Sequence, residues 1–303
     1  MKVNKPRGDN RTPLTFQSSG QMSSLLQRSR CHITLPLTVD VLDYILSFLE
    51  SDPKALEACC ISHPLLCQIA HPHIYANIYL RTSNLISYSN FGPYNLAKLL
   101  SDRPHIANYI RNLYIRVSGD SNENIGPFLQ EISTVFPKLL ALKKITLDHR
   151  STHTSFCWES QPKSFRIAFL GCLRSESVQH VCIRGISYFP FTSVWNGESR
   201  TIKSLTLTDC FKWHEASNQA PTLDTNSSPP IESLAVRRCG GDFLENFSGL
   251  VKTFRMHFRS LKFSQDHYKG YDPLPSLLSC SSSFLTSLDL DIGRNCMSVI
   301  YSL

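Results

Sequence analysis

Apolar side chains recur along most of this chain in a six-residue form, apolar-x-x-apolar-x-apolar. The last three positions alternate apolar, polar and apolar, which is typical of a short strand with one face on a core. Successive copies are 24 to 36 residues apart, and repetition at this period indicates a solenoid in which each unit stacks a strand on its neighbour. Seven copies centre on Leu113, Ile145, Val181, Leu205, Leu234, Leu261 and Leu288, and an earlier copy centres on Ile78.

A helical pattern precedes these repeats. We expect a helix from Val39 to Leu49 with Thr38 as its N-cap. The dipeptides Asp-Pro at 52–53 and His-Pro at 63–64 each begin another helix, because proline is pre-organised for the first helical position. Pro72 is expected to end the third helix, since the residue before a proline avoids the helical conformation.

The first of these helices carries more apolar surface than a helix in a small unit needs. Its apolar side chains form two adjacent stripes, so one stripe can fill the core of the unit and leave the other for a partner. The alternative is that both stripes are buried against the first repeats. One stripe comprises Val41, Ile45 and Phe48, and the other comprises Leu42, Leu46 and Leu49.

Composition divides the chain into three parts. Residues 1–32 are a basic tail that we expect to be disordered, residues 33–80 form the helical unit, and residues 81–303 hold the repeats. Residues 1–33 carry six basic residues against one acidic residue, so +5 of the net charge of +7 lies there. Two polar stretches are expected to be surface loops between repeats, at 149–163 and 213–230.

Cysteine content and hydropathy limit the cellular location. The chain has 11 cysteines, no apolar region behind its charged N-terminus and no stretch near the length of a membrane span. Reduced thiols and a cytoplasmic or nuclear location are therefore expected, with no membrane partner.

One segment, "CCISHPLLCQIAHPH", contains candidate metal ligands. Cys60, His63, Cys67 and His71 are spaced to share a helical face, and His73 is close. Zinc prefers such ligands, but two prolines interrupt the segment, so we interpret these residues as buried thiols and partly exposed histidines and expect no metal. No phosphate loop or catalytic motif is present, and we expect neither catalytic residues nor a cofactor.

The repeats resemble leucine-rich repeats, whose motif continues with Asn or Cys three positions after the last apolar residue. Cys210 and Cys239 occupy that position, while the other copies diverge from the motif. The resemblance implies an irregular solenoid with a parallel sheet.

The segment "LTVDVLDYILSFL" from Leu37 is similar to the start of an F-box, a unit that begins with Leu-Pro-x-Glu and continues with an apolar helix. The resemblance covers residues 33–80 and points to the F-box-like proteins of fungi with divergent leucine-rich repeats. Thr38 stands in place of the family proline, and Asp40 in place of the usual glutamate. The predicted fold is thus α/β, with a short three-helix F-box followed by an irregular repeat solenoid.

This resemblance implies the substrate-recognition subunit of an SCF-type cullin ubiquitin ligase. The F-box would bind a Skp-type adaptor, and through it a cullin, while the outward positions of the repeat strands would bind an unknown target protein. The adaptor-binding candidates are Leu37, Thr38, Val41, Leu42, Ile45, Leu46, Phe48, Leu49, Leu65 and Leu66. The target-binding candidates are Tyr114, Arg116, Asp148, Arg184, Thr206, Arg237, Lys262 and Asp289.

Other functions stay open at this point. A repeat scaffold with a decayed F-box would fit the replacement of the proline at Thr38. A nucleic-acid-associated protein would use the basic tail, although that tail lacks a dense basic run or interleaved aromatic residues. A thiol hydrolase would need a cysteine of low pKa.

Overall fold

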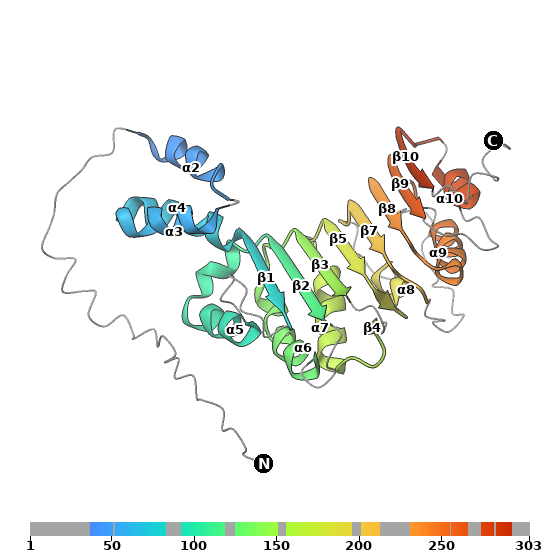
Figure 1. Ribbon diagram of the computed structural model, residues 1–303, viewed down its shortest axis with the longest axis horizontal. Coiled ribbons are helices and arrows are strands. Elements are labelled where there is room, and N and C mark those ends of the chain that lie inside the picture. Colours follow the sequence, from blue (N-terminus) through green and yellow to red (C-terminus); the bar gives the residue numbers. More distant parts are fainter. Residues whose placement is uncertain are drawn as a thin grey trace, which may run out of the picture.

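The computed structural model describes residues 37–50, 52–82, 92–118, 125–150, 156–195, 201–212, 231–254, 256–265, 274–281 and 283–292. Within them the protein is α/β, with an open parallel sheet of eight strands that follow one another in chain order (Figure 1). These strands are β1 (Asn77–Arg81), β2 (Asn112–Ser118), β3 (Lys144–Arg150), β5 (His180–Arg184), β7 (Ser204–Thr208), β8 (Ser233–Arg237), β9 (Ser260–Gln265) and β10 (Ser287–Ile292).

The register of the sheet follows the sequence repeat. The central apolar residues of all eight copies pair side by side, from Ile78 with Leu113 to Leu261 with Leu288. The hydrogen bonds that lead into the strands repeat as well: the Arg111 carbonyl accepts from the amides of Lys143 and Lys144, and the equivalent carbonyls do the same in later copies. The predicted strands are therefore confirmed, because alternation along each strand puts the same side of every copy into one core.

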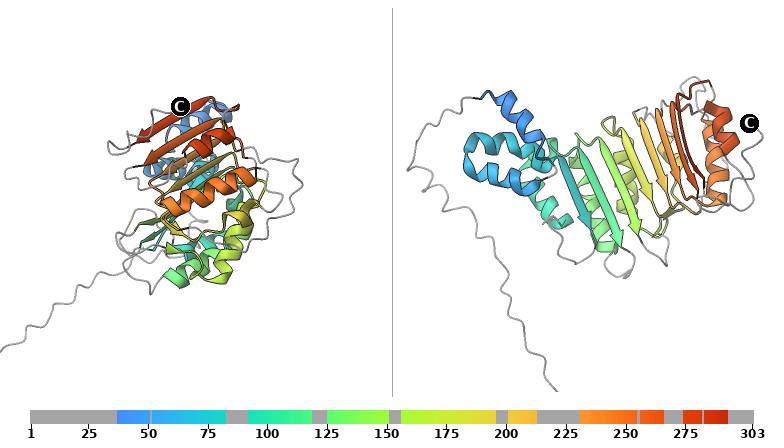
Figure 2. Two further views of the ribbon diagram at one scale, coloured as in Figure 1. Left: turned by 90° about the vertical axis from the view of Figure 1, so that its right-hand side faces the viewer. Right: turned by 45° about the horizontal axis from the view of Figure 1, so that its top comes forward.

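Helices cover one face of this sheet (Figure 2). The apolar strand residues and the apolar helix faces form one continuous hydrophobic cluster between them. In the described part of the chain no helix covers the other face of the sheet, which carries the polar strand residues. The covering segments are α5 (Pro93–Asp102), η1 (Pro104–Asn108), α6 (Ile125–Ser133), η3 (Phe136–Lys138), α7 (Lys163–Leu173), α8 (Phe191–Trp195), α9 (Gly241–Thr253) and α10 (Leu274–Ser281).

The prediction of a surface loop at 149–163 is wrong for part of its described residues, although Glu159 and Ser160 are exposed in a turn. His149 belongs to β3 and is buried. A second, two-stranded sheet pairs β4 (Phe156–Cys157) with β6 (Ile186–Ser187). Trp158 is buried, and its ring contacts those of phenylalanines from α7 and from the segment after β6. Two aromatic side chains in a polar stretch thus anchor it to the core. The other predicted loop, 213–230, lies outside the described residues.

The turn after the strand repeats in three neighbouring copies. Gly185, Asp209 and Arg238 each follow the last residue of a strand, with φ of 68°, 54° and 50°. The next residue in two of these copies is a buried cysteine whose thiol donates to backbone carbonyls: Cys210 to Ile183 and Thr208, and Cys239 to Arg237. A left-handed residue therefore follows all three strands, and a buried thiol comes next after β7 and β8.

Three helices precede the sheet and have a hydrophobic core of their own. They are α2 (Val39–Ser47), α3 (Pro53–Ser62) and α4 (Pro64–Ala76). The predicted starts of α3 and α4 are confirmed: the Asp52 carboxylate accepts from the Ala55 amide, and the His63 ring accepts from the Leu65 amide. Thr38 precedes α2 at the N-cap position, but its side chain makes no capping hydrogen bond.

The end predicted for the third helix is wrong. Pro72 lies inside α4, which continues to Ala76. Asn77 begins β1 directly after it, and Ile78 and Leu80 are buried in the core of the sheet. Residues 77–80 therefore pack with the sheet, four residues earlier than the predicted boundary, because the first apolar copy belongs to the repeats.

Candidate functional site

The two apolar stripes of α2 have different surroundings. Leu42 and Leu46 are 6% and 3% exposed, inside the core of the helical unit, and Leu49 packs against that core. Val41 and Ile45 are 42% and 45% exposed, on the surface. The predicted division into a core stripe and a surface stripe is confirmed, and burial of both stripes is wrong.

The exposed stripe is larger than the sequence pattern indicated. Phe48 is 67% exposed and meets the ring of Tyr44 edge-on at 4.9 Å between centroids. Leu37 and Val39 are exposed as well, but Leu37 precedes α2 and Val39 lies on the opposite side of the helix from Ile45 and Phe48. We call the surface of Val41, Tyr44, Ile45 and Phe48 the α2 patch. Tyr44 was not a candidate, although its spacing of four residues from Phe48 on a helix would have shown it.

The remaining adaptor-binding candidates divide in the same way. Burial of Leu42 and Leu46 removes them from contact with any partner, so these two candidates are corrected to core residues. Leu65 and Leu66 are half-buried against the same core, and Thr38 is exposed next to the α2 patch.

The imidazole of His73 connects α4 to α2 through carboxylates. His73 of α4 has a side chain that is 10% exposed, and its two ring nitrogens each lie 2.9 Å from a carboxylate oxygen, one on Asp43 and one on Glu50. These contacts join α4 to α2 at Asp43 and to the segment just after α2 at Glu50. The α2 patch is therefore presented on a supported helix rather than on a loose segment.

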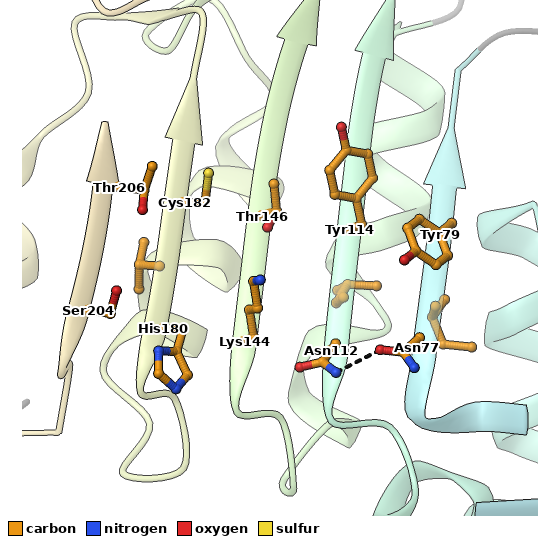
Figure 3. Close-up of a pocket in the computed structure, with 13 residues that line it drawn as sticks. Asn77, Tyr79, Asn112, Tyr114, Lys144, Thr146, His180, Cys182, Ser204 and Thr206 are labelled. Carbon is orange, nitrogen blue, oxygen red and sulfur yellow. Dashed lines mark hydrogen bonds between the residues drawn. The ribbon is translucent and has the colours of Figure 1, made fainter. Parts of the chain in front are cut away.

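The polar face of the sheet is organised in rows that cross the strands. Figure 3 shows the side chains of β1 to β7 projecting from this face around a groove of about 390 Å³. The Asn112 side chain on β2 donates a hydrogen bond of 2.7 Å to the Asn77 side chain on the adjacent β1. The Tyr79 and Tyr114 rings lie 5.6 Å apart in the next row. Thr206, a target-binding candidate, lines the same groove.

Asp148 is the centre of the row nearest the carboxyl ends of the strands. Its side chain is 2% exposed. Arg116 and Arg150 donate to it from Nε at 3.2 and 3.0 Å, and the Arg184 Nε lies 3.6 Å from its second oxygen. The Tyr114 hydroxyl also donates to it, and in turn accepts from Arg116 at 2.7 Å.

This arrangement corrects one target-binding candidate and explains others. Asp148 faces the polar side as predicted, but neighbouring side chains cover it, so it positions Arg116 and Arg184 instead of meeting a ligand. Burial and the hydrogen bond to Asp148 raise the pKa of Tyr114. The tyrosine therefore stays a neutral donor toward the carboxylate.

Asp209 extends the network toward β8. It accepts from Arg184 at 3.1 Å and from Arg238 at 3.0 Å. Among the residues that the structure describes, and counting Arg81 and Arg237 from the same row, six arginines lie along this edge of the polar face against two aspartates, a local charge of +4. The full set of arginines is Arg81, Arg116, Arg150, Arg184, Arg237 and Arg238.

The charge reverses at the last two strands. Lys262 forms an ion pair with Asp289, and Ser264 donates to Asp291 at 3.1 Å. These side chains are exposed or half-buried. The polar face therefore runs from basic at the middle strands to acidic at β10, and a mixed surface of this kind suits a protein ligand better than a uniform polyanion.

The structure also brings three of the candidate metal ligands together. The ligand atoms of Cys60, Cys67 and His71 all lie within 4.8 Å of one another. His63 and His73 are engaged elsewhere, in the cap of α4 and with the carboxylates beside α2. Burial beside Cys67 raises the pKa of the Cys60 thiol to about 11, and burial together with Arg103 lowers the pKa of His71.

Comparison with known proteins does not identify a family for this chain, so a function has to be argued from the surfaces described above. No protein-family model matches the chain, and no curated protein matches it significantly. Among the helices that the structure describes, none combines the length and the apolar character needed to cross a bilayer.

Proposed function

We propose that this protein is the substrate-recognition subunit of a cullin-type ubiquitin ligase. In this proposal the helical unit is an F-box that binds a Skp-type adaptor, and the sheet with its helices is a divergent leucine-rich-repeat solenoid that holds a target protein. The protein contributes proximity rather than bond-making, because tethering raises the concentration of the target at a catalyst carried elsewhere.

The observation that carries the proposal is the α2 patch. Its four side chains share one face of α2 and its C-cap residue, while the companion stripe already completes the core of the unit. Exposed apolar side chains gathered in this way mark interaction sites on soluble proteins. At about 25 cal/mol per Å² of apolar area removed from water, a partner covering several of these side chains would gain several kcal/mol before the cost of association.

Two features of the sheet support the solenoid. The strands stack in chain order in one register, and the bonds that lead into them recur from copy to copy. The thiols of Cys210 and Cys239 bind backbone carbonyls at the position where leucine-rich repeats carry Asn or Cys. The polar face then offers a surface that one target can contact across several strands.

Co-purification with a fungal Skp-type adaptor tests the proposal. The parent chain is compared with Ile45→Asp, which puts a charge in the α2 patch. Ile167→Asp is the matched control, because Ile167 is a 62% exposed isoleucine on α7, on the helical side of the sheet. We expect the parent and Ile167→Asp to retain the adaptor, and a folded Ile45→Asp variant to lose it.

Absence of binding by the folded parent at micromolar concentration, about −8 kcal/mol, would overturn the proposal. A repeat scaffold with a decayed F-box would then be the better assignment. Equal loss in Ile45→Asp and Ile167→Asp would also count against it, because the adaptor would not be recognising the α2 patch.

A further inference from the structure

We propose that Cys60, Cys67 and His71 bind one zinc ion that clamps α3 to α4. The site stands apart from the α2 patch and from the polar face of the sheet. It holds whether or not the chain is a ligase subunit, because it rests on the geometry of the helical unit alone.

Two of the ligands share one face of α4. Cys67 and His71 are four residues apart, and the Cys67 Sγ lies 3.4 Å from the His71 Nε2. Zinc–sulfur bonds of about 2.3 Å and zinc–nitrogen bonds of about 2.0 Å at a tetrahedral angle require a separation of about 3.5 Å. This pair is thus already spaced as zinc ligands.

The third ligand comes from the neighbouring helix. Cys60 lies in α3, which ends at Ser62 and turns at His63 into α4. The three ligand atoms lie within 4.8 Å of one another, and two thiolates on one zinc are about 3.8 Å apart. Movement of the ligand atoms by about 1 Å therefore completes the set, a distance that side-chain rotation covers.

The sequence argued against this site because Pro64 and Pro72 interrupt the segment, and Pro72 is the one that separates His71 from the rest of a helix. A helix broken at that residue would release His71 from the face that carries Cys67. Because α4 continues through Pro72 to Ala76, His71 stays on the same face.

The chemistry of the donors selects the metal. Two thiolates and an imidazole suit zinc better than a hard cation such as magnesium or calcium. Each thiol loses its proton to solvent on binding, so one Zn²⁺ replaces two protons and the completed site is neutral. Neutrality matters because Arg103 and His105 lie close enough to act electrostatically on His71.

The site has room for a fourth ligand from solvent. Cys60, Cys67 and His71 are each half-buried rather than enclosed. We therefore assign water to the fourth position, as in zinc sites with three protein ligands. The ion would fix the α3–α4 hairpin close to the point where α4 runs into β1, since the ring of Tyr75 contacts His71 and packs on the core of the sheet.

Cobalt substitution tests the site on the whole chain. The reduced protein is stripped with a chelator and titrated with Co²⁺. We expect one equivalent to give a thiolate-to-cobalt charge-transfer band and the intense visible bands of a tetrahedral site, and Zn²⁺ to abolish them. Cys67→Ser and His71→Gln are expected to weaken metal binding by at least about 100-fold.

Cys59→Ser is the matched control. Cys59 precedes Cys60 in the same helix and packs on the core of the unit, outside the cluster. Metal binding should be retained in this variant. In the parent, Zn²⁺ should also protect Cys60 and Cys67, but not Cys59, from alkylation, which tests the ligands without any substitution.

Three results would overturn the proposal. The first is that the parent gives no thiolate-to-cobalt band. The second is that the band survives in Cys67→Ser. The third is that Zn²⁺ does not change the rate at which Cys60 and Cys67 of the reduced protein are alkylated.

Discussion

Replacement of Asp148 by asparagine should destabilise the sheet more than any other single change of charge on its polar face. Asparagine keeps the size of the side chain but removes the negative charge. Arg116, Arg150 and Arg184 would then surround a neutral amide, whose NH₂ group faces guanidinium donors.

The size of the effect follows from burial. Breaking a buried ion pair by removing one partner costs about 3–5 kcal/mol. Here the carboxylate is 2% exposed, but the three arginine side chains are 25%, 52% and 30% exposed and recover hydration when released. Discounting for that screening, we expect the free energy of unfolding to fall by about 2–3 kcal/mol.

Urea denaturation measures the change, with the fluorescence of buried Trp158 reporting on the core. Asp289→Asn is the control, because Asp289 pairs with Lys262 on the same face but is 53% exposed. That variant should change the free energy of unfolding by less than about 1 kcal/mol. The deficit of Asp148→Asn should narrow as salt is added, since salt screens the unpaired arginines. If the two variants behave alike, Asp148 does not hold the arginines as described.

Three further predictions concern stability. Gly185→Ala should lower the free energy of unfolding by about 2 kcal/mol or more in urea, because φ is +68° and a Cβ would lie 2.3 Å from the His149 carbonyl oxygen. Leu46→Ala should cost about 2–5 kcal/mol and Ile45→Ala less than about 0.5 kcal/mol in the same assay, since only Leu46 is buried. Burial lowers the pKa of His149 below 6.5, so below that pH the unfolded state takes up a proton that the folded state refuses, and stability falls by up to about 1.4 kcal/mol per pH unit. A stability profile from pH 7 to pH 5 should therefore be flatter for His149→Gln than for the parent.

The sheet was predictable because its signal is local and repeated. Three alternating apolar and polar positions predict each strand, and the central apolar residue of every copy, from Ile78 to Leu288, faces one core. The presence of two apolar stripes on α2 follows from helical spacing in the same way, although the spacing does not say which stripe faces the core. Neither inference needs knowledge of distant contacts.

The errors arise where contacts between elements decide burial, as for Leu42 and Leu46, which are buried on the core of the helical unit instead of exposed to a partner. Asp148 is polar on a polar face, and only the arginines from β2 and β5 make it buried. Trp158 lies in a polar stretch, and its place in the core depends on Phe165, Phe169 and Phe189. Pro72 removes one backbone donor, and packing of α4 against α2 and α3 sustains the helix across it.

The junction between the two hydrophobic cores bears on how tethering could work. Ala76 ends α4 and Asn77 begins β1 with no loop between them, and the Arg111 amide donates to the Ala76 carbonyl at 3.0 Å. Tyr75, one residue earlier, packs on the core of the sheet. A flexible joint would spread a bound target over a large volume and dilute it at the catalyst, whereas a stiff joint confines it to a narrow range of positions. In the function proposed above, direct passage from helix to strand would confine the target in this way, and a zinc ion on α3 and α4 would stiffen the same junction, because the ring of His71 contacts that of Tyr75.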